Sequence, residues 1–384
     1  MVEIPSGLFT DKNHLAEAIE LAKDHKRRLH EMPEMAFNEH RTTEYIREVC
    51  SAYPLSLIDL GMDTGLVYLL DAGRDEAVAL RADIDAVPTA NGPLHLCGHD
   101  AHSSTLIGAI HYLCAVKDSL PCNVVFIFQP AEEGTRGAKA VLEHGLLDKL
   151  PQRPSCIFGI HNRPEEDCGN IVVHRGPLMS EKSVFRITIN GKPGHGSLPH
   201  KCVDPVVAAA SIICGIQTIV SRNIDPFEPA ICTVNSIKAG DSESSAPENA
   251  YITGYIRSFD HNTHEHMADR LTELAMDISK AYQCRCRVSI THMVPAVDNT
   301  QEMYEKAMKA ARAVVSEKHI IDCRAVLASE DFAVYGEHIP SFLYWVGSGI
   351  PGKQCASWHD PAFEMDTRYM ETAVPLMCAS VLTH

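Results

Sequence analysis

The sequence predicts a mixed, largely parallel α/β sheet with helices on both faces, interrupted by an inserted ferredoxin-like α+β domain. The chain has 384 residues, about twice a usual domain, so two domains are expected. Short apolar strands alternate with amphipathic helices toward both ends, a pattern typical of a parallel sheet. Between them the order is β-α-β-β-α-β, the ferredoxin-like pattern. We therefore expect one domain at residues 1–182 and 296–384, and an inserted domain at 183–295.

The outer domain begins with two amphipathic helices, at residues 12–29 after the cap candidate Thr10 and at 39–50. Runs rich in apolar and β-branched residues then predict three strands with one helix before the last of them (strands 65–70, 77–80 and 123–128; helix 103–116). The alternation resumes after the insertion (helices 300–316 and 366–382; strands 324–327 and 341–346).

The inserted domain is expected to form four strands and two helices (strands 185–190, 230–237, 250–259 and 285–292; helices 204–222 and 264–283). The first strand alternates between apolar and polar residues, which predicts one buried and one exposed face. The uncharged apolar stretch at 205–220 is too short for a membrane span and predicts a buried helix.

Composition excludes several classes of partner. A net charge of −16 argues against binding to nucleic acid or to an anionic membrane. The first residues show neither a basic segment nor an apolar segment of a secretory signal, so we expect a soluble cytoplasmic protein. Its 14 cysteines are then expected to be reduced, and together with 21 histidines they justify a search for metal ligands.

Metal-ligating residue types gather where predicted strands end. Cys97 and His99 are two residues apart, and Gly98 lets the backbone bend between them, so both side chains can reach one ion. Glu132 and Glu133 directly follow a buried strand and project in different directions. One of them can therefore ligate a metal while the other moves protons.

Four further residues extend this set. Asp83 and Asp85 lie two apart where a strand ends, His161 follows another strand, and His359 lies far along the chain. A lone histidine is more often structural, so the hypothesis depends on the whole set. Five donors at one edge of a sheet are enough for two metals that share ligands (Cys97, His99, Glu133, His161 and His359). A thiolate with imidazoles suits zinc or another borderline first-row metal.

The chain resembles the M20 metallopeptidase family in eight motifs that occur in the same order: RRLHEMPEMAFNEH, LRADIDAVP, LCGHDAH, FQPAEEG, GIHN, GKPGHGSLPH, SEDF and SWHDPAFE. The similarity covers nearly the whole chain. It is to the amidohydrolase branch, which includes hippurate hydrolases, auxin-conjugate hydrolases and N-acetyldiaminopimelate deacetylases. The resemblance implies a catalytic domain that holds two divalent metals (Zn, Mn, Co or Ni). It also implies that the inserted domain is a lid that commonly mediates homodimerisation.

The resemblance also assigns roles to residues. It implies that Cys97, His99, Glu133, His161 and His359 are the metal ligands. Glu132 corresponds to the general base, Asp83 to a carboxylate that supports the metal site, and His195 to a histidine that binds the substrate carbonyl oxygen, often from the partner subunit. The implied reaction is hydrolysis of the amide bond of an N-acyl amino acid, releasing a carboxylic acid and a free amino acid.

Some positions leave the substrate open. Only eight residues separate Pro88 from Cys97, a shorter loop than in many relatives. Ser244 stands where the family often has asparagine, and Arg257 is a candidate partner for a substrate carboxylate or for a surface salt bridge. A dipeptidase and an N-acetyldiaminopimelate-type deacetylase are therefore alternatives, and a non-catalytic metal- or ligand-binding relative is a third.

Overall fold

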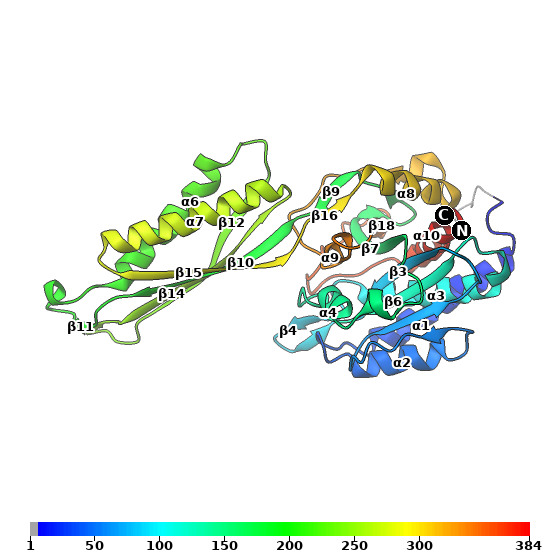
Figure 1. Cartoon of the computed structure of the whole chain (residues 1–384), viewed down its shortest axis with the longest axis horizontal. Coiled ribbons are helices and arrows are strands. Elements are labelled where there is room, and N and C mark those ends of the chain that lie inside the picture. The colour runs from blue at the N-terminus through cyan, green and yellow to red at the C-terminus, as the bar shows by residue number, and fades with distance from the viewer. Residues whose placement is uncertain (1–6) are drawn as a thin grey trace. The chain divides into compact units, whose positions relative to one another are not determined.

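The computed structural model describes residues 7–384, which fall into two compact units (Figure 1). The first unit contains the chain up to Leu178 together with Asp298–Arg324 and Asp331–His384. The second contains Met179–Val297 and Ala325–Glu330. Strands β9 (Gly176–Met179) and β16 (Val297–Asn299) lie where the chain passes from one unit to the other.

The first unit is built on an eight-stranded mixed sheet. Its central pairs β6–β3, β3–β7 and β7–β18 are parallel, and the β1–β2 and β2–β6 pairs at one edge are antiparallel. The strands in spatial order are β1 (Ser56–Leu57), β2 (Leu66–Leu70), β6 (Asn123–Gln129), β3 (Ala77–Asp83), β7 (Cys156–Asp167), β18 (Ser341–Gly349), β8 (Ile171–Val172) and β17 (Ile320–Ile321). A hairpin outside this sheet pairs β4 (Val87–Thr89) with β5 (Gly92–Leu94).

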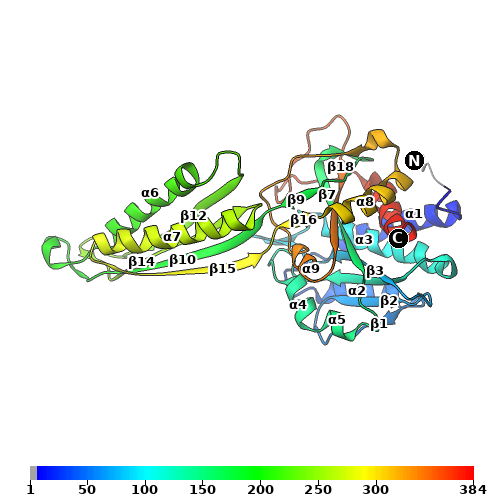
Figure 2. The same cartoon turned by 45° about the horizontal axis from the view of Figure 1, so that its top comes forward.

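Helices cover both faces of this sheet, as predicted (Figure 2). Alternate β3 residues such as Leu80 enter an apolar core shared with helices on one face. Arg81 points to the other face, where its guanidinium lies 5.8 Å from the centre of the Phe332 ring just before α9. The helices are α1 (Lys12–His30), α2 (His40–Cys50), α3 (His99–Ala115), α4 (Gly137–Glu143), α5 (Leu146–Lys149), α8 (Gln301–Val314), α9 (Ala333–Gly336) and α10 (Met370–Leu382).

Helix α1 begins at Lys12 as predicted, but its N-cap lies one residue later than the predicted cap. Asp11, and not Thr10, is the N-cap residue, because its carboxylate accepts a hydrogen bond of 2.9 Å from the His14 amide. The Asp11 side chain satisfies an amide that has no partner within the helix.

His25 on α1 makes the stability of the first unit depend on pH. Burial, followed by the nearby Arg28 charge, lowers the pKa of His25 from its usual 6.5 to about 4. The unfolded chain therefore binds more protons between these two values, and stability is lost as the pH falls through that window. We expect wild type to lose about 1–2 kcal/mol more than His25→Gln between pH 6.5 and pH 4.5, after allowance for partial exposure of the ring. Urea denaturation at both pH values measures this, and equal losses in the two proteins would contradict it.

The second unit has the predicted ferredoxin-like order. Its antiparallel sheet runs β12 (Ala230–Ala239), β14 (Asn249–Ser258), β10 (Glu181–Asn190) and β15 (Arg285–Val294). Helices α6 (Pro205–Asn223) and α7 (His261–Ala281) pack on this sheet through a separate apolar core. Strand β10 alternates between buried and more exposed residues, as its sequence pattern predicts.

Helix α6 differs from its prediction. It has 19 residues, and within the described part of the chain it is long and apolar enough to cross a membrane by length and composition alone. One face, which includes Ile212 and Ile216, packs into the core of the second unit. The other face is open, with Val206 38% and Val207 47% exposed. The helix is therefore half-buried, and the prediction of a buried helix was wrong for its outer face.

The strand predicted at 324–327 does not form. Within the described chain, this segment has one isolated bridge, between Val326 and Met179. The carbonyl groups at its end and just beyond it are bound within the second unit. Leu327 accepts a hydrogen bond of 2.7 Å from the Arg257 guanidinium, and the next residue, Ala328, accepts one of 2.7 Å from the Ser180 amide. Tertiary hydrogen bonds thus replace the expected strand pairing.

Candidate metal centre

The first unit brings all five predicted metal ligands together. Two overlapping groups of ligand atoms, each spanning no more than 4.8 Å, share the Cys97 thiol: one adds His99 and His161, the other adds Glu133 and His359. Shared ligation of this kind is what a pair of metals requires. The donors come from the start of α3, the loop after β6, the middle of β7 and the loop after β18. His161 was expected at a strand end, but β7 continues for six residues to Asp167.

Gly98 determines how the backbone enters helix α3, which carries His99. Its φ of 90° lies in the left-handed region, and it serves as the N-cap of α3. A side chain at this position would also collide with Asn162. The helix therefore begins at His99, four residues before its predicted start, and this brings His99 into the centre.

The His99 ring is oriented as a metal ligand. Its Nδ1 lies 3.0 Å from the Asp85 carbonyl oxygen, so it donates there and leaves Nε2 as the unprotonated atom. Buried Nε2 forms no hydrogen bond to any residue from 7 to 384. It lies 3.7 Å from an Asp83 oxygen and 3.9 Å from an oxygen of each of Glu132 and Glu133. The lone pair of His99 Nε2 thus faces three carboxylates at distances that leave room for a divalent cation between them.

The charges around His99 agree with this fit. Burial alone lowers the pKa of His99, but the Asp83 carboxylate, followed by the adjacent Cys97, outweighs burial and raises it well above its usual value. The surroundings therefore favour positive charge at this position.

Cys97 and His161 supply the softer donors. The Cys97 Sγ lies 3.5 Å from His161 Nε2, while His161 Nδ1 lies 2.8 Å from the Asn162 carbonyl oxygen. Burial raises the pKa of the Cys97 thiol to about 12. A bound cation reverses such a shift, because a coordinated thiol is deprotonated.

Glu133 and His359 complete the second group. The His359 Nε2 lies 3.2 Å from a Glu133 oxygen. Burial raises the pKa of Glu133, but the hydrogen bond from His359 and the charge of His99 outweigh burial and lower it. His359 has a φ of 66° and is held through its amide, which donates to the Leu96 carbonyl over 2.8 Å. A non-glycine residue in this conformation is typical of a functional position.

Two residues that received no role from the sequence organise the centre. The Asp85 carboxylate accepts hydrogen bonds from the backbone amides of Glu132 at 3.1 Å and Glu133 at 3.0 Å. It therefore fixes the backbone position of both glutamates. His102 accepts from the Asn162 amide at 3.0 Å and donates to Asp83 over 2.7 Å. Its place one turn after His99 on α3 was the only signal in the sequence.

The three remaining predicted residues lie in the second unit. The short strands β11 (Gly194–His195) and β13 (Ser245–Ala246) pair His195 with Ser245, and the carbonyl of Ser244 accepts from the Gly196 amide over 2.8 Å. His195 and Ser244 are therefore neighbours. Arg257 lies elsewhere, on β14, where its guanidinium stacks 4.9 Å from the centre of the Tyr255 ring and is bound by the Leu327 carbonyl.

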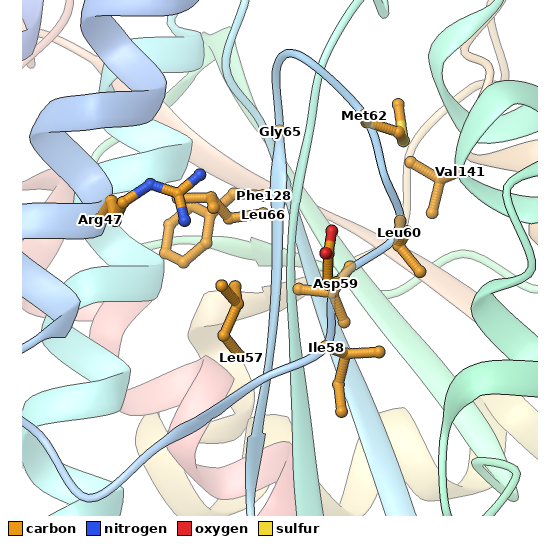
Figure 3. Close-up of a pocket in the computed structure, with 11 residues that line it drawn as sticks. Arg47, Leu57, Ile58, Asp59, Leu60, Met62, Gly65, Leu66, Phe128 and Val141 are labelled. Carbon is orange, nitrogen blue, oxygen red and sulfur yellow. The ribbon is translucent and has the colours of Figure 1, made fainter.

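A separate pocket in the first unit contains none of the predicted site residues (Figure 3). The Arg47 guanidinium reaches it from α2, and Asp59 lies in the loop after β1. Its lining is mostly apolar (Arg47, Leu57, Ile58, Asp59, Leu60, Met62, Gly65, Leu66, Val67, Phe128 and Val141). The predicted site residues of the first unit thus lie outside this pocket.

Nitrogen, sulfur and carboxylate donors around one buried point, with a second carboxylate beside them, define a metal-dependent hydrolase. Comparison with known proteins agrees. Residues 79–382 match peptidase family M20/M25/M40. The chain is 34% identical to N-acetylcysteine deacetylase of Bacillus subtilis, over 91% of this chain and 92% of that one. It is 31% identical to the IAA-amino acid hydrolase ILR1-like 2 of Arabidopsis thaliana, over 89% and 80%.

A solved structure agrees with both the fold and the centre. It is that of Bacillus subtilis YXEP, a dinuclear metal-binding peptidase of the M20 family. It superposes with a TM-score of 0.81 at 30% identity, covering 97% of this chain and 98% of that one. The protein described here belongs to peptidase family M20/M25/M40. It is a metal-dependent amidohydrolase whose centre holds divalent metals.

Proposed function

We propose that the protein hydrolyses the amide bond of N-acyl amino acids, releasing a carboxylic acid and a free amino acid. The observation that carries the proposal is the His99 Nε2, which faces Asp83, Glu132 and Glu133 with no hydrogen bond to any described residue. The relatives that act on N-acetylcysteine and on IAA-amino acids support the substrate class.

Bound metals supply Lewis acidity, which polarises the amide carbonyl and lowers the pKa of water. The metal ligands in this proposal are Cys97, His99, Glu133, His161 and His359. Glu132 is the general base: it takes a proton from the attacking water and returns it to the leaving amine. Asp83, buried and bound by the Arg81 guanidinium at 2.9 Å, positions the metal site as a carboxylate that stays ionised.

Residues of the second unit are proposed to bind substrate. His195 donates a hydrogen bond to the carbonyl oxygen, where negative charge develops during attack. Arg257 and Ser244 are weaker candidates for contacts to the amino-acid part. We also propose that the second unit acts as the lid of the catalytic unit.

The proposed metals are two divalent ions among Zn, Mn, Co and Ni, since nitrogen, sulfur and carboxylate donors suit any of these. We expect the metal-stripped protein to release no amino acid and each restoring metal to give a different fraction of full activity. The measurement is amino-acid release under reducing conditions from N-acetyl, N-benzoyl and longer N-acyl amino acids, with dipeptides alongside.

The same panel separates the alternatives. Preference for free-amine dipeptides would indicate a dipeptidase, and turnover confined to N-acetyldiaminopimelate would indicate a deacetylase of that type. Bound metal without release from any compound would contradict the proposed function and favour a non-catalytic ligand-binding relative.

We propose a homodimer formed through the second unit. Of the twelve large apolar side chains that are exposed in residues 7–384, eight lie in that unit (Leu198, Val206, Val207, Phe227, Ile237, Tyr251, Met276 and Tyr282), although it contains about a third of the chain. We expect Val207→Lys to halve the mass measured by light scattering. Leu57→Lys, at a residue of the first unit with similar exposure (45%), should leave the mass unchanged. Dimers of equal stability in both variants would contradict an interface on this helix face.

We also propose a cytoplasmic location. Its support is that all 14 cysteines lie in the described part of the chain and are free thiols, as expected in a reducing compartment.

A further inference from the structure

We infer that His14, Glu17 and His111 form a second divalent-metal site in the first unit, separate from the catalytic centre, which joins helix α1 to helix α3. Their ligand atoms lie within 4.8 Å of one another. His14 and Glu17 are three residues apart on α1, so their side chains share one face of that helix. His111 reaches them from the last turns of α3.

The two imidazoles are already brought together. Their rings are stacked, with centres 4.4 Å apart and planes 7° from parallel. The His14 Nδ1 lies 3.4 Å from a Glu17 carboxylate oxygen. A nitrogen from each of two helices and a carboxylate oxygen therefore lie within 4.8 Å of one another. Because the lone pairs of parallel rings cannot meet at one ion, one of the two rings has to turn about its side-chain bonds when the ion binds.

His111 gives the second, independent observation. Its Nδ1 lies 3.1 Å from the Tyr53 hydroxyl, a contact that leaves Nε2 to act as the ligand. That Nε2 is buried and makes no hydrogen bond within residues 7–384. A buried polar atom without a partner is costly, and a cation at this point would satisfy it.

The donor set selects the ion. Two imidazoles and one carboxylate suit Zn²⁺ and its first-row neighbours, whereas magnesium and calcium prefer oxygen ligands. Tetrahedral zinc holds its ligand atoms about 3.4 Å apart, so the three side chains need to close in by about 1 Å. Glu17 is free to do so, because its side chain is 67% exposed.

The test uses the protein with its catalytic centre loaded with zinc. Further Zn²⁺ is titrated by calorimetry, and bound zinc is counted by mass spectrometry after dialysis. We expect wild type to bind one more equivalent per chain than His111→Asn, whose amide can still bond Tyr53 but has no Nε2. Glu17→Gln, at an exposed position that tolerates change, should weaken the extra equivalent by about tenfold or more.

The matched control is His144→Asn, which removes an exposed histidine of the same unit outside the group. It should bind zinc like wild type, and all three variants should keep wild-type amide hydrolysis. Excess Zn²⁺ should raise the melting temperature of wild type and His144→Asn but not of His111→Asn, because the ion joins two helices only when bound. Equal zinc counts and affinities in wild type, His111→Asn and Glu17→Gln would overturn the inference, whether or not the proposed hydrolysis is found.

Discussion

Glu132→Gln is expected to lower kcat for amide hydrolysis by about a thousandfold while leaving the metals bound, since general acid–base catalysis contributes about 10²–10⁴-fold. Glu132 is buried, and one of its carboxylate oxygens lies 3.9 Å from His99 Nε2. The amide preserves the shape of the side chain but cannot take a proton from water. Steady-state kinetics and metal analysis on the same preparations measure the two effects.

Glu133→Gln is the matched control, because it makes the same change one residue along. Glu133 belongs to the proposed ligand group with Cys97 and His359, so its amide should lose metal as well as activity. Metal content, and not the rate alone, would then distinguish the role of Glu132 from that of Glu133. Glu132→Gln with more than a tenth of wild-type turnover, or with the metal loss expected of Glu133→Gln, would show that the two roles are assigned wrongly.

The sequence could predict that these donors come together because of how a parallel sheet is built. Glu133 lies in the loop after β6, and His161 lies on β7; these two strands flank β3 in the sheet. The carboxyl ends of such strands meet at one edge, so residues far apart in the chain could be assigned to one site without coordinates.

The supporting contacts could not be predicted in this way. Asp85 binds the amides of Glu132 and Glu133 only because two loops 47 residues apart approach one another. The missing strand at 324–327 has a similar cause, since the Leu327 carbonyl is bound by the Ser180 hydroxyl and by the Arg257 guanidinium, both far away in the chain. Apolar pattern indicates a strand, but it does not show which partner takes the backbone groups.

Asp331→Ala is expected to destabilise the first unit by about 3–5 kcal/mol, the range for breaking one side of a buried ion pair. The Asp331 carboxylate is fully buried and accepts hydrogen bonds from Arg81 at 3.0 Å, Gln129 at 2.7 Å and the Ala138 amide at 3.0 Å. Arg81 is also fully buried, so the alanine variant leaves part of its guanidinium charge and two neutral donors without their acceptor.

Tryptophan fluorescence during urea denaturation isolates this effect, because both tryptophans, Trp345 and Trp358, belong to the first unit. Wild type and variant need the same metal content, since bound metal adds stability by mass action. Glu143→Ala is the control: it removes an exposed partner of Lys139 at 3.7 Å and should cost no more than about 0.5 kcal/mol. If the two variants lose similar stability, the Arg81–Asp331 contact is not a buried pair on which the sheet depends. A loss of stability in Asp331→Ala alone would show that β3, which carries Arg81, is stabilised by a carboxylate 250 residues further along the chain.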